Sequence, residues 1–269
     1  MNLLVFDIET VPDLESARRL FDLQDLPERE VIAFLKEKKG EFLPPHWHRI
    51  VAIAVLYRGA GREGKEVLTL RALGQPDDPE KELIASFFKI IDRYTPVLVS
   101  WNGSGFDLPV LHYRALLYAI PAPRYWEVGD GDATFRSNHY LGRYHWRHID
   151  LMDVLSGYQP RGWAPLDEVA RMAGLPGKLG LSGEEVCLSW LEGEIEKIRN
   201  YCEIDVLNTY LLYLRFEKMR GRLRGERFEQ AIRQLDRMLL EEGSRRSHLS
   251  IFRELWRRSD LSLQSHDGG

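Results

Sequence analysis

The chain opens on a short apolar run that carries two acids, and this run limits the available folds more than any other segment. Residues 3–8 read Leu-Leu-Val-Phe-Asp-Ile, a pattern typical of a strand buried at the centre of a sheet. Pro12 ends the run, because proline cannot extend a central ladder. Asp7 and Glu9 lie two residues apart and therefore project from the same face of the strand.

Two carboxylates held this close repel each other, so they need either raised pKa values or a cation. Carboxylate oxygens are ligands that suit Mg²⁺ or Mn²⁺. The alternative is that this Asp-x-Glu only ends the strand at a turn, and the pair alone does not decide between the two.

Composition allows one large domain, or one domain with an extension. The 269 residues are 44% hydrophobic and 29% charged, which is ordinary for a protein with a substantial core. No apolar run is long enough to cross a bilayer, and no charged leader precedes the first strand. The two cysteines, Cys187 and Cys202, are too few for a disulfide framework. We therefore expect a reduced, cytoplasmic protein without a membrane segment.

Charge is distributed unevenly along the chain. The net charge is −4, yet residues 215–258 carry +6, which leaves −10 for the remainder. A basic tail beside an acidic site is compatible with binding a phosphate backbone. Three roles for the tail stay open: a helical cap packed on the main domain, an arm that contacts phosphates, or a surface for a protein partner.

The order of segments predicts an α/β fold with a mixed sheet. Short helices are expected within 13–26 and 28–39, a hairpin from 48–57 and 67–73, a helix that starts at 77–80 and stops near Thr95 and Pro96, and buried strands at 97–101 and 147–150. Helices follow at 108–119, 166–173, 183–191 and 194–220. We expect a domain at 1–222, a basic amphipathic helical extension at 223–260 and a disordered tail at 261–269.

Two further acidic features lie near apolar elements. Asp107 follows the strand at 97–101 and begins a helix, with Asn102 and Phe106 just before it. Tyr201 and Asp205 are four residues apart and so share one face of a long helix, whose opposite stripe is apolar. Local alternatives remain: Asp107 could be only an N-cap, and Asp205 could lie on a solvated helix face.

Taken in order, these motifs resemble the tyrosine subclass of the DEDD 3′–5′ exonucleases, and within it the predicted exonucleases related to the proofreading domain of family B DNA polymerases. The resemblance rests on Asp-x-Glu, then Asn-x₃-Phe-Asp, then Tyr-x₃-Asp, together with the wording around them at residues 6–12, 48–53, 102–111, 148–153, 174–178 and 201–210. It covers roughly residues 1–220. It implies a ribonuclease H-like fold, a mixed β-sheet flanked by helices.

The resemblance also implies a two-metal site. Asp7, Glu9 and Asp205 would hold one divalent cation, Mg²⁺ or Mn²⁺. Asp7 would bridge to a second cation, supported by Asp107 directly or through water. Tyr201 would orient the attacking water, since its ordinary pKa of about 10 makes it a poor base. Asn200 stands where the histidine subclass carries its histidine.

Substrate contacts follow in the same way. By resemblance, backbone groups around Ile8 and Thr10 and the side chains of Asn102 and Phe106 lie beside the terminal nucleotide. Stacking on an aromatic face tolerates any base. The predicted function is hydrolysis of single-stranded 3′ ends to nucleoside 5′-monophosphates, with DNA as the first choice of substrate. The alternatives are an RNA 3′-trimming enzyme and a non-catalytic nucleic-acid-binding module.

Other signals remain open. His139, His145 and His148 lie among aromatic and basic residues, which allows an incomplete zinc site, a surface for single-stranded nucleic acid, or an ordinary loop. Asp150 either caps a helix or supports the site from behind. The glycine-rich segment before Lys178 is a turn, or it brings Lys178 to a phosphate. Trp101 stands where the resemblance leads us to expect Phe or Tyr. This difference affects the expected contact with the 3′-terminal base.

Overall fold

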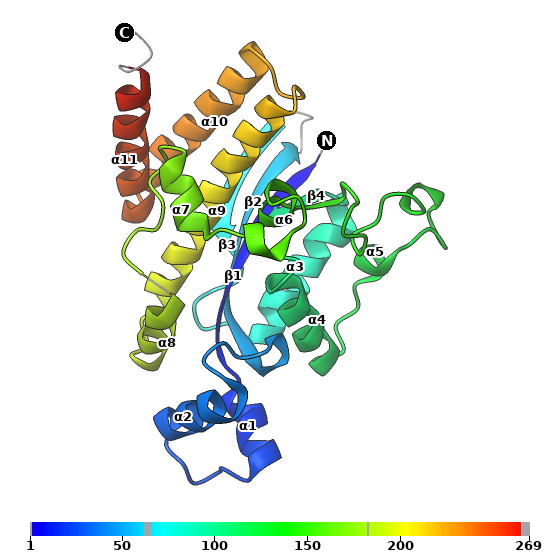
Figure 1. The fold of residues 1–269 in the computed structure, drawn as a ribbon, viewed down its shortest axis with the longest axis vertical. Coiled ribbons are helices and arrows are strands. Elements are labelled where there is room, and N and C mark those ends of the chain that lie inside the picture. Colours follow the sequence, from blue (N-terminus) through cyan, green and yellow to red (C-terminus); the bar gives the residue numbers. More distant parts are fainter. Residues whose placement is uncertain (1, 62–65, 182, 265–269) are drawn as a thin grey trace.

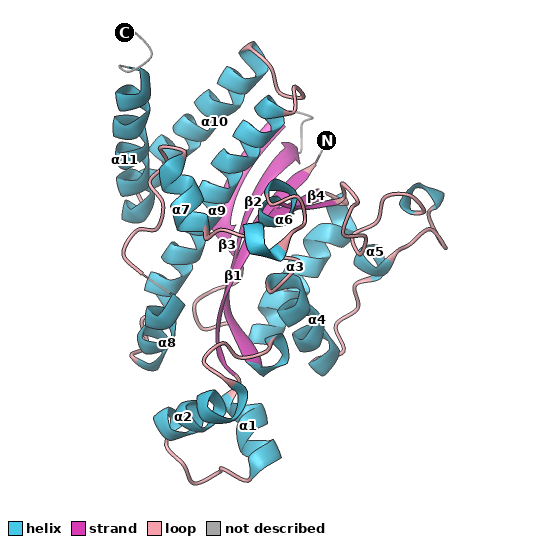
Figure 2. Cartoon of the chain, in the orientation of Figure 1, coloured by secondary structure: helices cyan, strands magenta, loops and turns pink. Residues whose placement is uncertain are grey.

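In a computed structural model of the chain, which describes residues 2–61, 66–181 and 183–264, five strands form one mixed sheet (Figures 1 and 2). The strands are ordered β3-β2-β1-β4-β5. Central β1 is antiparallel to β2 and parallel to β4. The bounds are β1 (Leu3–Pro12), β2 (His48–Ala60), β3 (Glu66–Ala72), β4 (Val97–Ser100) and β5 (His148–Asp150). Helices cover both faces, so the predicted α/β, ribonuclease H-like fold is confirmed.

One face of the sheet is covered by the long helix α9 (Ile195–Met219), which crosses β1 and β2 (Figure 1). Leu3 and Val5 project from β1 toward this helix and meet its apolar stripe, which includes Cys202 and Val206. The shorter helices α7 (Leu166–Met172) and α8 (Gly183–Leu191) pack beside α9. The sequence predicted this stripe and its contact with the sheet.

The opposite face carries α3 (Glu80–Tyr94), α4 (Asp107–Leu117) and the short α5 (Pro123–Trp126). The alternate residues of β1, among them Leu4, Phe6 and Ile8, project into this second core. Side-chain alternation along a strand explains why neighbouring residues of β1 serve two different cores. The short helix α6 (Leu151–Leu155) follows β5 directly.

A small helical hairpin follows β1 before the chain returns as β2. Its helices are α1 (Leu14–Phe21) and α2 (Glu28–Lys39), as predicted, and a 3₁₀ turn at 45–47 leads into β2. Val31, Leu35 and Trp47 form a separate small core there. Figure 1 shows the hairpin at one end of the sheet, beyond the end of β1.

The hairpin is tied to the sheet by a buried ion cluster, named here the Arg114 cluster: Asp13, Glu80, Arg114 and Tyr118. The Arg114 guanidinium donates to both Asp13 and Glu80. The Tyr118 hydroxyl donates to Glu80 Oε2 at 2.8 Å, and the Ile50 backbone N–H donates to Glu80 Oε1 at 2.7 Å. The two carboxylates therefore share one internal cation, Arg114.

The C-terminal helices α10 (Glu226–Gly243) and α11 (Ser247–Gln264) share the core of α9, through Leu235, Leu239 and Phe252. This matches the helical-cap alternative for the tail. None of the described helices is long and apolar enough to cross a membrane.

A polar clamp also holds the tail. Buried Glu203 of α9 accepts from Arg246 Nη2 at 2.6 Å and lies 2.7 Å from His248 Nε2. Its other oxygen accepts from the Ala72 N–H of β3 at 2.7 Å. Helix α9, the edge strand β3 and the tail are therefore joined at one carboxylate.

The described part of helix α11 extends to Gln264 and so overlaps the segment expected to be disordered from residue 261. Propagating an existing helix adds one hydrogen bond per residue fixed, and no glycine or proline interrupts the sequence before Gly268. Residues 265–269 of the expected tail lie outside the described residues. The division of the chain at residue 222 stays a proposal.

Candidate active site

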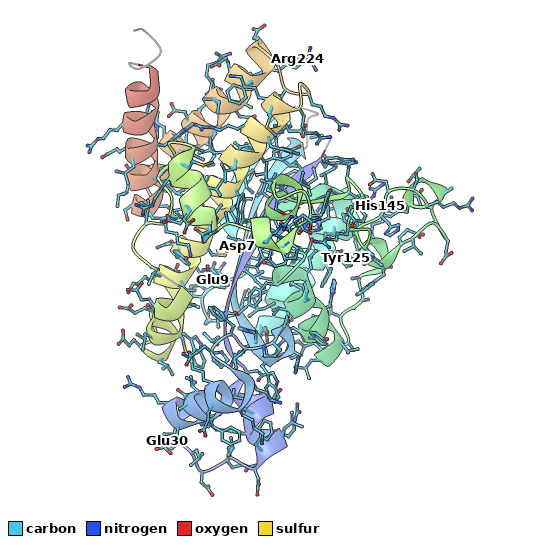
Figure 3. The ribbon with its side chains drawn as sticks, in the orientation of Figure 1. Asp7, Glu9, Glu30, Tyr125, His145 and Arg224 are labelled. Carbon is cyan, nitrogen blue, oxygen red and sulfur yellow. The ribbon has the colours of Figure 1, made fainter. Side chains whose placement is uncertain are left out.

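Asp7 and Glu9 lie side by side on β1 and face α9 (Figure 3). They pair across the sheet with Ala54 and Ala52, whose small side chains leave room above the strand. The register shifts directly after Glu9, as in a β-bulge, and bulges often re-aim side chains next to active sites. Among the described residues, one oxygen each of Asp7 and Glu9 and the Cys202 sulfur lie within 4.8 Å of one another.

Asp107 is the first residue of α4 and reaches the free edge of β1. β4 pairs with β1 only as far as Val5, so the Ile8 N–H has no partner from β4. Asp107 Oδ1 accepts from that N–H at 3.2 Å. The N-cap position belongs to Phe106, so Asp107 is not simply a cap. Its carboxylate connects α4 to the strand that carries Asp7.

Asp205 and Tyr201 are both buried on the face of α9 that looks toward Asp7 and Glu9. The alternative that Asp205 lies on a solvated helix face is therefore wrong. The Tyr201 hydroxyl lies near Asp205, since each group influences the pKa of the other. Asp205 Oδ1 is buried and has no hydrogen-bond partner within the described ranges. Leaving such an atom unsatisfied costs free energy unless something else binds it.

The four carboxylates keep their protons more tightly than ordinary acids do. Burial is the first cause, and repulsion from neighbouring carboxylates adds to it for Asp7 and Glu9, whose pKa values are raised well above the usual range. Burial raises the pKa of Asp107 to about 7 and that of Asp205 to about 6. Four electrostatically linked acids with raised pKa values are typical of a functional site.

Lys178 is the cation that approaches this group. Its charge lowers the pKa values of Glu9 and Asp205, and its Nζ lies 5.3 Å from the Tyr201 ring centroid. One lysine cannot neutralise four carboxylates. Burial also raises the pKa of the Cys202 thiol, so Cys202 stays protonated and is a poor ligand. The remaining donors are oxygens, which suit Mg²⁺ or Mn²⁺, and the unsatisfied Asp205 oxygen fits such an ion.

On the side expected to hold the terminal nucleotide, Thr10 and Phe106 meet at His48. The Thr10 hydroxyl lies 2.8 Å from His48 Nδ1, while His48 Nε2 is 3.0 Å from the Leu43 carbonyl oxygen. Burial lowers the pKa of His48, which keeps it neutral. The Phe106 ring meets the His48 ring edge-on at 4.9 Å. The Ile8 N–H is engaged by Asp107, so this group supports Asp107 instead of facing a ligand.

Asn102 is held in an unusual conformation by Asp150. Its φ is +63°, which costs energy for a residue with a side chain. Asp150 accepts from the N–H groups of Asn102 and Ser104, both at 2.9 Å, and also caps α6. A Cβ on Gly105 would lie 2.5 Å from the Asn102 side-chain oxygen. Any other residue at position 105 would therefore force the Asn102 side chain to move. Asp150 thus has both of the roles that the sequence left open.

Asn102 lines a cavity of about 460 Å³, whose walls also include His112, Arg143 and Trp163. Within the described part of the chain, His139, His145 and His148 do not form a group of potential metal ligands. Buried His148 hydrogen-bonds with Ser100 at 2.8 Å, and His139 and His145 pair with each other.

Trp101 is a core residue whose indole N–H donates to the Ala164 carbonyl at 3.0 Å. It therefore fastens the end of β4 to the segment before α7. The glycine-rich segment is a turn held by Asn208, which bonds to both the N–H and the carbonyl of Gly177.

Sequence patterns missed the parts played by His48 and Cys202. The sequence places His48 at the start of a strand and identifies Cys202 as one of two cysteines without a disulfide framework. Cys202 Sγ lies 3.3 Å from the Asp7 carbonyl oxygen. The position of Cys202, one residue after Tyr201, could have indicated this contact. The stripe of α9 that packs on β1 must touch that strand close to Asp7 and Glu9.

The sequence also resembles known proteins. Residues 40–256 match the family described as "Predicted 3'-5' exonuclease related to the exonuclease domain of PolB". The matched range begins after Asp7 and Glu9 and extends through α10 into α11, beyond the end at residue 220 that was expected.

The curated relatives are archaeal DNA polymerases. The chain is 32% identical over 139 residues to the DNA polymerase of Archaeoglobus fulgidus, covering 49% of this chain and 17% of that protein. It is 28% identical over 178 residues to the DNA polymerase of Pyrococcus glycovorans, covering 61% and 22%. DNA polymerase 1 of Aeropyrum pernix is 31% identical over 159 residues, covering 55% and 14%. The chain therefore spans less than a quarter of the length of these polymerases.

Proposed function

The chain belongs to the family of predicted 3′–5′ exonucleases related to the exonuclease domain of PolB, and on this premise we propose that it removes nucleotides from the 3′ ends of single-stranded DNA. Asp7, Glu9, Asp107 and Asp205 would hold two divalent cations, Mg²⁺ or Mn²⁺. Bound there, the cations would activate the attacking water and stabilise the leaving oxygen. The observation that carries the proposal is the buried, unpartnered Asp205 Oδ1 among carboxylates that one lysine cannot neutralise.

The proposed reaction is hydrolysis of the terminal phosphodiester. A water oxygen bonds to phosphorus, and the bond from phosphorus to the 3′ oxygen of the preceding nucleotide breaks. That oxygen leaves as a hydroxyl, so the products are a nucleoside 5′-monophosphate and a strand shorter by one nucleotide. Every step is chemically the same for all four bases, which agrees with a site built from carboxylates and aromatic rings.

Tyr201 serves as a positioning group in this proposal. Burial and the neighbouring carboxylates raise the pKa of its hydroxyl above the ordinary value of 10, so it cannot accept a proton from water at neutral pH. Its position one turn before Asp205 on α9 instead keeps the hydroxyl among the candidate metal ligands, whose charges act on it. Lys178, near the Tyr201 ring, supplies a positive charge that favours a phosphate at this face.

Thr10, Asn102 and Phe106 would receive the terminal nucleotide. The Thr10 hydroxyl and the Phe106 ring are held together by His48, and Asp150 fixes the backbone of Asn102. Such pre-arranged contacts reduce the entropy lost on binding. The half-buried Phe106 offers a stacking surface for a base.

A labelled oligonucleotide tests the proposal. A 5′-labelled single strand of DNA incubated with Mn²⁺ or Mg²⁺ should give a descending ladder of products, which disappears with chelator or with Asp7→Ala. Asp25→Ala, an exposed change on the helical hairpin, is the matched control and should keep the ladder. A 3′ end that stays intact while the protein binds it would support a non-catalytic binding module instead. Faster decay of matched RNA would indicate the RNA-trimming alternative.

A further inference from the structure

The turn between α9 and α10 presents an unusual concentration of positive charge, named here the arginine turn: Arg220, Arg222, Arg224 and Arg227. Glu226 is the single acid between Arg220 and Arg227. Arg222, Arg224 and Arg227 are exposed, and within the described residues no acid lies within ion-pair distance of these three. Figure 3 shows Arg224 at the outer end of this turn.

The arginines from Arg246 onward are different. Arg246 pairs with Glu203, and Arg253 pairs with Asp236 at 2.8 Å. Arg257 is also near Asp236, at 3.8 Å. Within the turn itself, Arg220 pairs with Glu217 at 2.8 Å. The positive charge predicted for the tail is thus largely compensated on α11 and left uncompensated at Arg222, Arg224 and Arg227. Uncompensated arginines at a surface attract phosphate groups.

An exposed tryptophan lies against this turn. The Arg220 guanidinium is 3.8 Å from the centroid of the Trp146 ring, and the Phe216 ring lies parallel to Trp146 at 6.4 Å. Trp146 nevertheless remains 40% exposed. An exposed aromatic ring flanked by arginines is the combination that proteins use to bind single strands, because bases stack on the ring while phosphates meet the charges.

Further aromatic rings and an arginine lie near the cavity that Asn102 lines, on the same segment of chain as Trp146. Trp163 and Arg143 line that cavity. Arg143 lies over the Tyr158 ring at 5.7 Å, and the Tyr158 and Tyr144 rings are 4.7 Å apart. The charge of Arg220 also acts on the pKa of Tyr158. Aromatic rings and arginines are therefore present both at the cavity and at the arginine turn.

We propose that Trp146 and the arginine turn form a second nucleic-acid contact, which binds the single strand upstream of the 3′ end held in the candidate active site. The inference rests on the proposed function. Arg220 follows Asp205 by fifteen residues along α9, or about 22 Å at 1.5 Å per residue. With one phosphate per about 3.4 Å of stacked strand, the second contact begins about six nucleotides from the 3′ end.

Binding measured in chelator tests this contact without any hydrolysis. The full chain is titrated into 5′-fluorescein-labelled oligothymidylates of four to twenty nucleotides, and anisotropy gives Kd at several salt concentrations. The test variant is Arg222→Gln with Arg224→Gln. The control is Arg233→Gln with Arg237→Gln, which removes the same charge from exposed positions on α10.

The test variant should bind the twenty-nucleotide strand about ten-fold more weakly than the wild type. Its slope of log K against log salt should be shallower by about 1.4, since each lost phosphate contact on a single strand contributes about 0.7. The difference in Kd between this variant and the wild type should first appear with strands of about six nucleotides and should be small with strands of four. Trp146→Ala should weaken binding of the long strand alone by about five-fold or more, which is the effect of losing one stacked base.

The proposal is overturned if the arginine-turn variant and its α10 control weaken the long strand equally, or if the loss is the same at four and twenty nucleotides. Circular dichroism checks that each variant is folded. This test and the test of the proposed function can fail separately. Wild-type protein that shows the length dependence of binding but leaves 3′ ends intact with Mn²⁺ would support the second contact and contradict the proposed exonuclease activity.

Discussion

Two buried groups of acids share helix α4 and are balanced in opposite ways. In the Arg114 cluster, Asp13 and Glu80 share the guanidinium of Arg114, and hydrogen bonds from Tyr118 and Ile50 complete the set. In the candidate active site, Asp7, Glu9, Asp107 and Asp205 have one lysine nearby and an unpartnered oxygen. Helix α4 contributes to both groups, with Asp107 at its start and Arg114 two turns later.

The difference shows how to separate structural from functional acids in this chain. A buried carboxylate with an internal cation is self-sufficient, and removing the cation destabilises the fold. A group of buried carboxylates that lacks internal cations destabilises the folded state until ions arrive from solution. Substitutions in the two clusters should therefore have opposite effects on activity and on stability.

Asp7→Asn should give the largest effect. We expect cleavage of a labelled strand to slow by at least about a thousand-fold, comparable with the loss of one charge-stabilising group elsewhere. In chelator the same change should leave the melting temperature unchanged or raise it, because it removes one of several repelling buried charges. Single-turnover cleavage and thermal unfolding measure the two effects. A variant that loses stability instead would place Asp7 in a structural role.

Arg114→Met should do the reverse. It leaves Asp13 and Glu80 buried without their cation, which costs about 3–5 kcal/mol of unfolding free energy. Urea denaturation measures the loss, and the folded fraction should still cleave DNA. Lys197→Met is the control, because Lys197 and Glu194 form an exposed pair, worth about 0–1 kcal/mol. Equal losses in the two variants would contradict the contrast between the clusters.

Divalent cations should stabilise the wild-type protein and not the Asp7→Asn variant. At a Mn²⁺ concentration one hundred times Kd, linkage predicts a gain of about 2.7 kcal/mol in unfolding free energy. The same titration should stabilise Arg114→Met as fully as it does the wild type, since that change leaves the candidate ligands in place. Urea denaturation with and without Mn²⁺ gives the comparison. Equal stabilisation of Asp7→Asn would show that the ion binds elsewhere.

The smallest effect is on pH dependence. Asp107, with its pKa raised to about 7, and Asp205, with its pKa raised to about 6, keep protons in the folded state that the unfolded chain releases above about pH 4. Their contribution to stability is therefore present below pH 4 and lost as pH rises through 6 and 7. In chelator the melting temperature should fall from pH 5.5 to pH 8, by about 2–4 °C for each kcal/mol lost.

Asp107→Asn is the variant that sharpens this result. It should flatten the fall between pH 5.5 and pH 8, because the asparagine side chain does not titrate. Saturating Mn²⁺ should also reduce the fall, since the metal binds the deprotonated acids and its affinity rises with pH. A wild-type curve that rises across this range in chelator would contradict the raised pKa values.

Local periodicity predicted the parts of the site that lie within one element. A spacing of two on a strand put Asp7 and Glu9 on one face, and a spacing of four on a helix did the same for Tyr201 and Asp205. The fold class followed from the order of strands and helices. The catalytic and metal-binding roles of Asp7, Glu9, Tyr201 and Asp205 stay predictions.

Contacts between distant segments were beyond the reach of such patterns. Nothing in the local sequence tells that the turn at Gly177 brings Lys178 over Tyr201, or that His48 joins Thr10 to Phe106. The amphipathic stripe of α10 predicted a helix with a buried face, but the period does not specify which partner covers that face. Periodicity also does not specify where α11 ends, because a helix that has begun gains one hydrogen bond for each residue it adds.

The clamp at Glu203 has a practical consequence for anyone who shortens or tags this protein. Glu203 stands two residues before Asp205 on α9, and Arg246 from the tail neutralises it. A truncation at residue 222 would remove both Arg246 and His248 and leave Glu203 without its two side-chain partners. Purification handles and fusion partners therefore belong at sites that leave α11 seated, and a minimal catalytic fragment should include it.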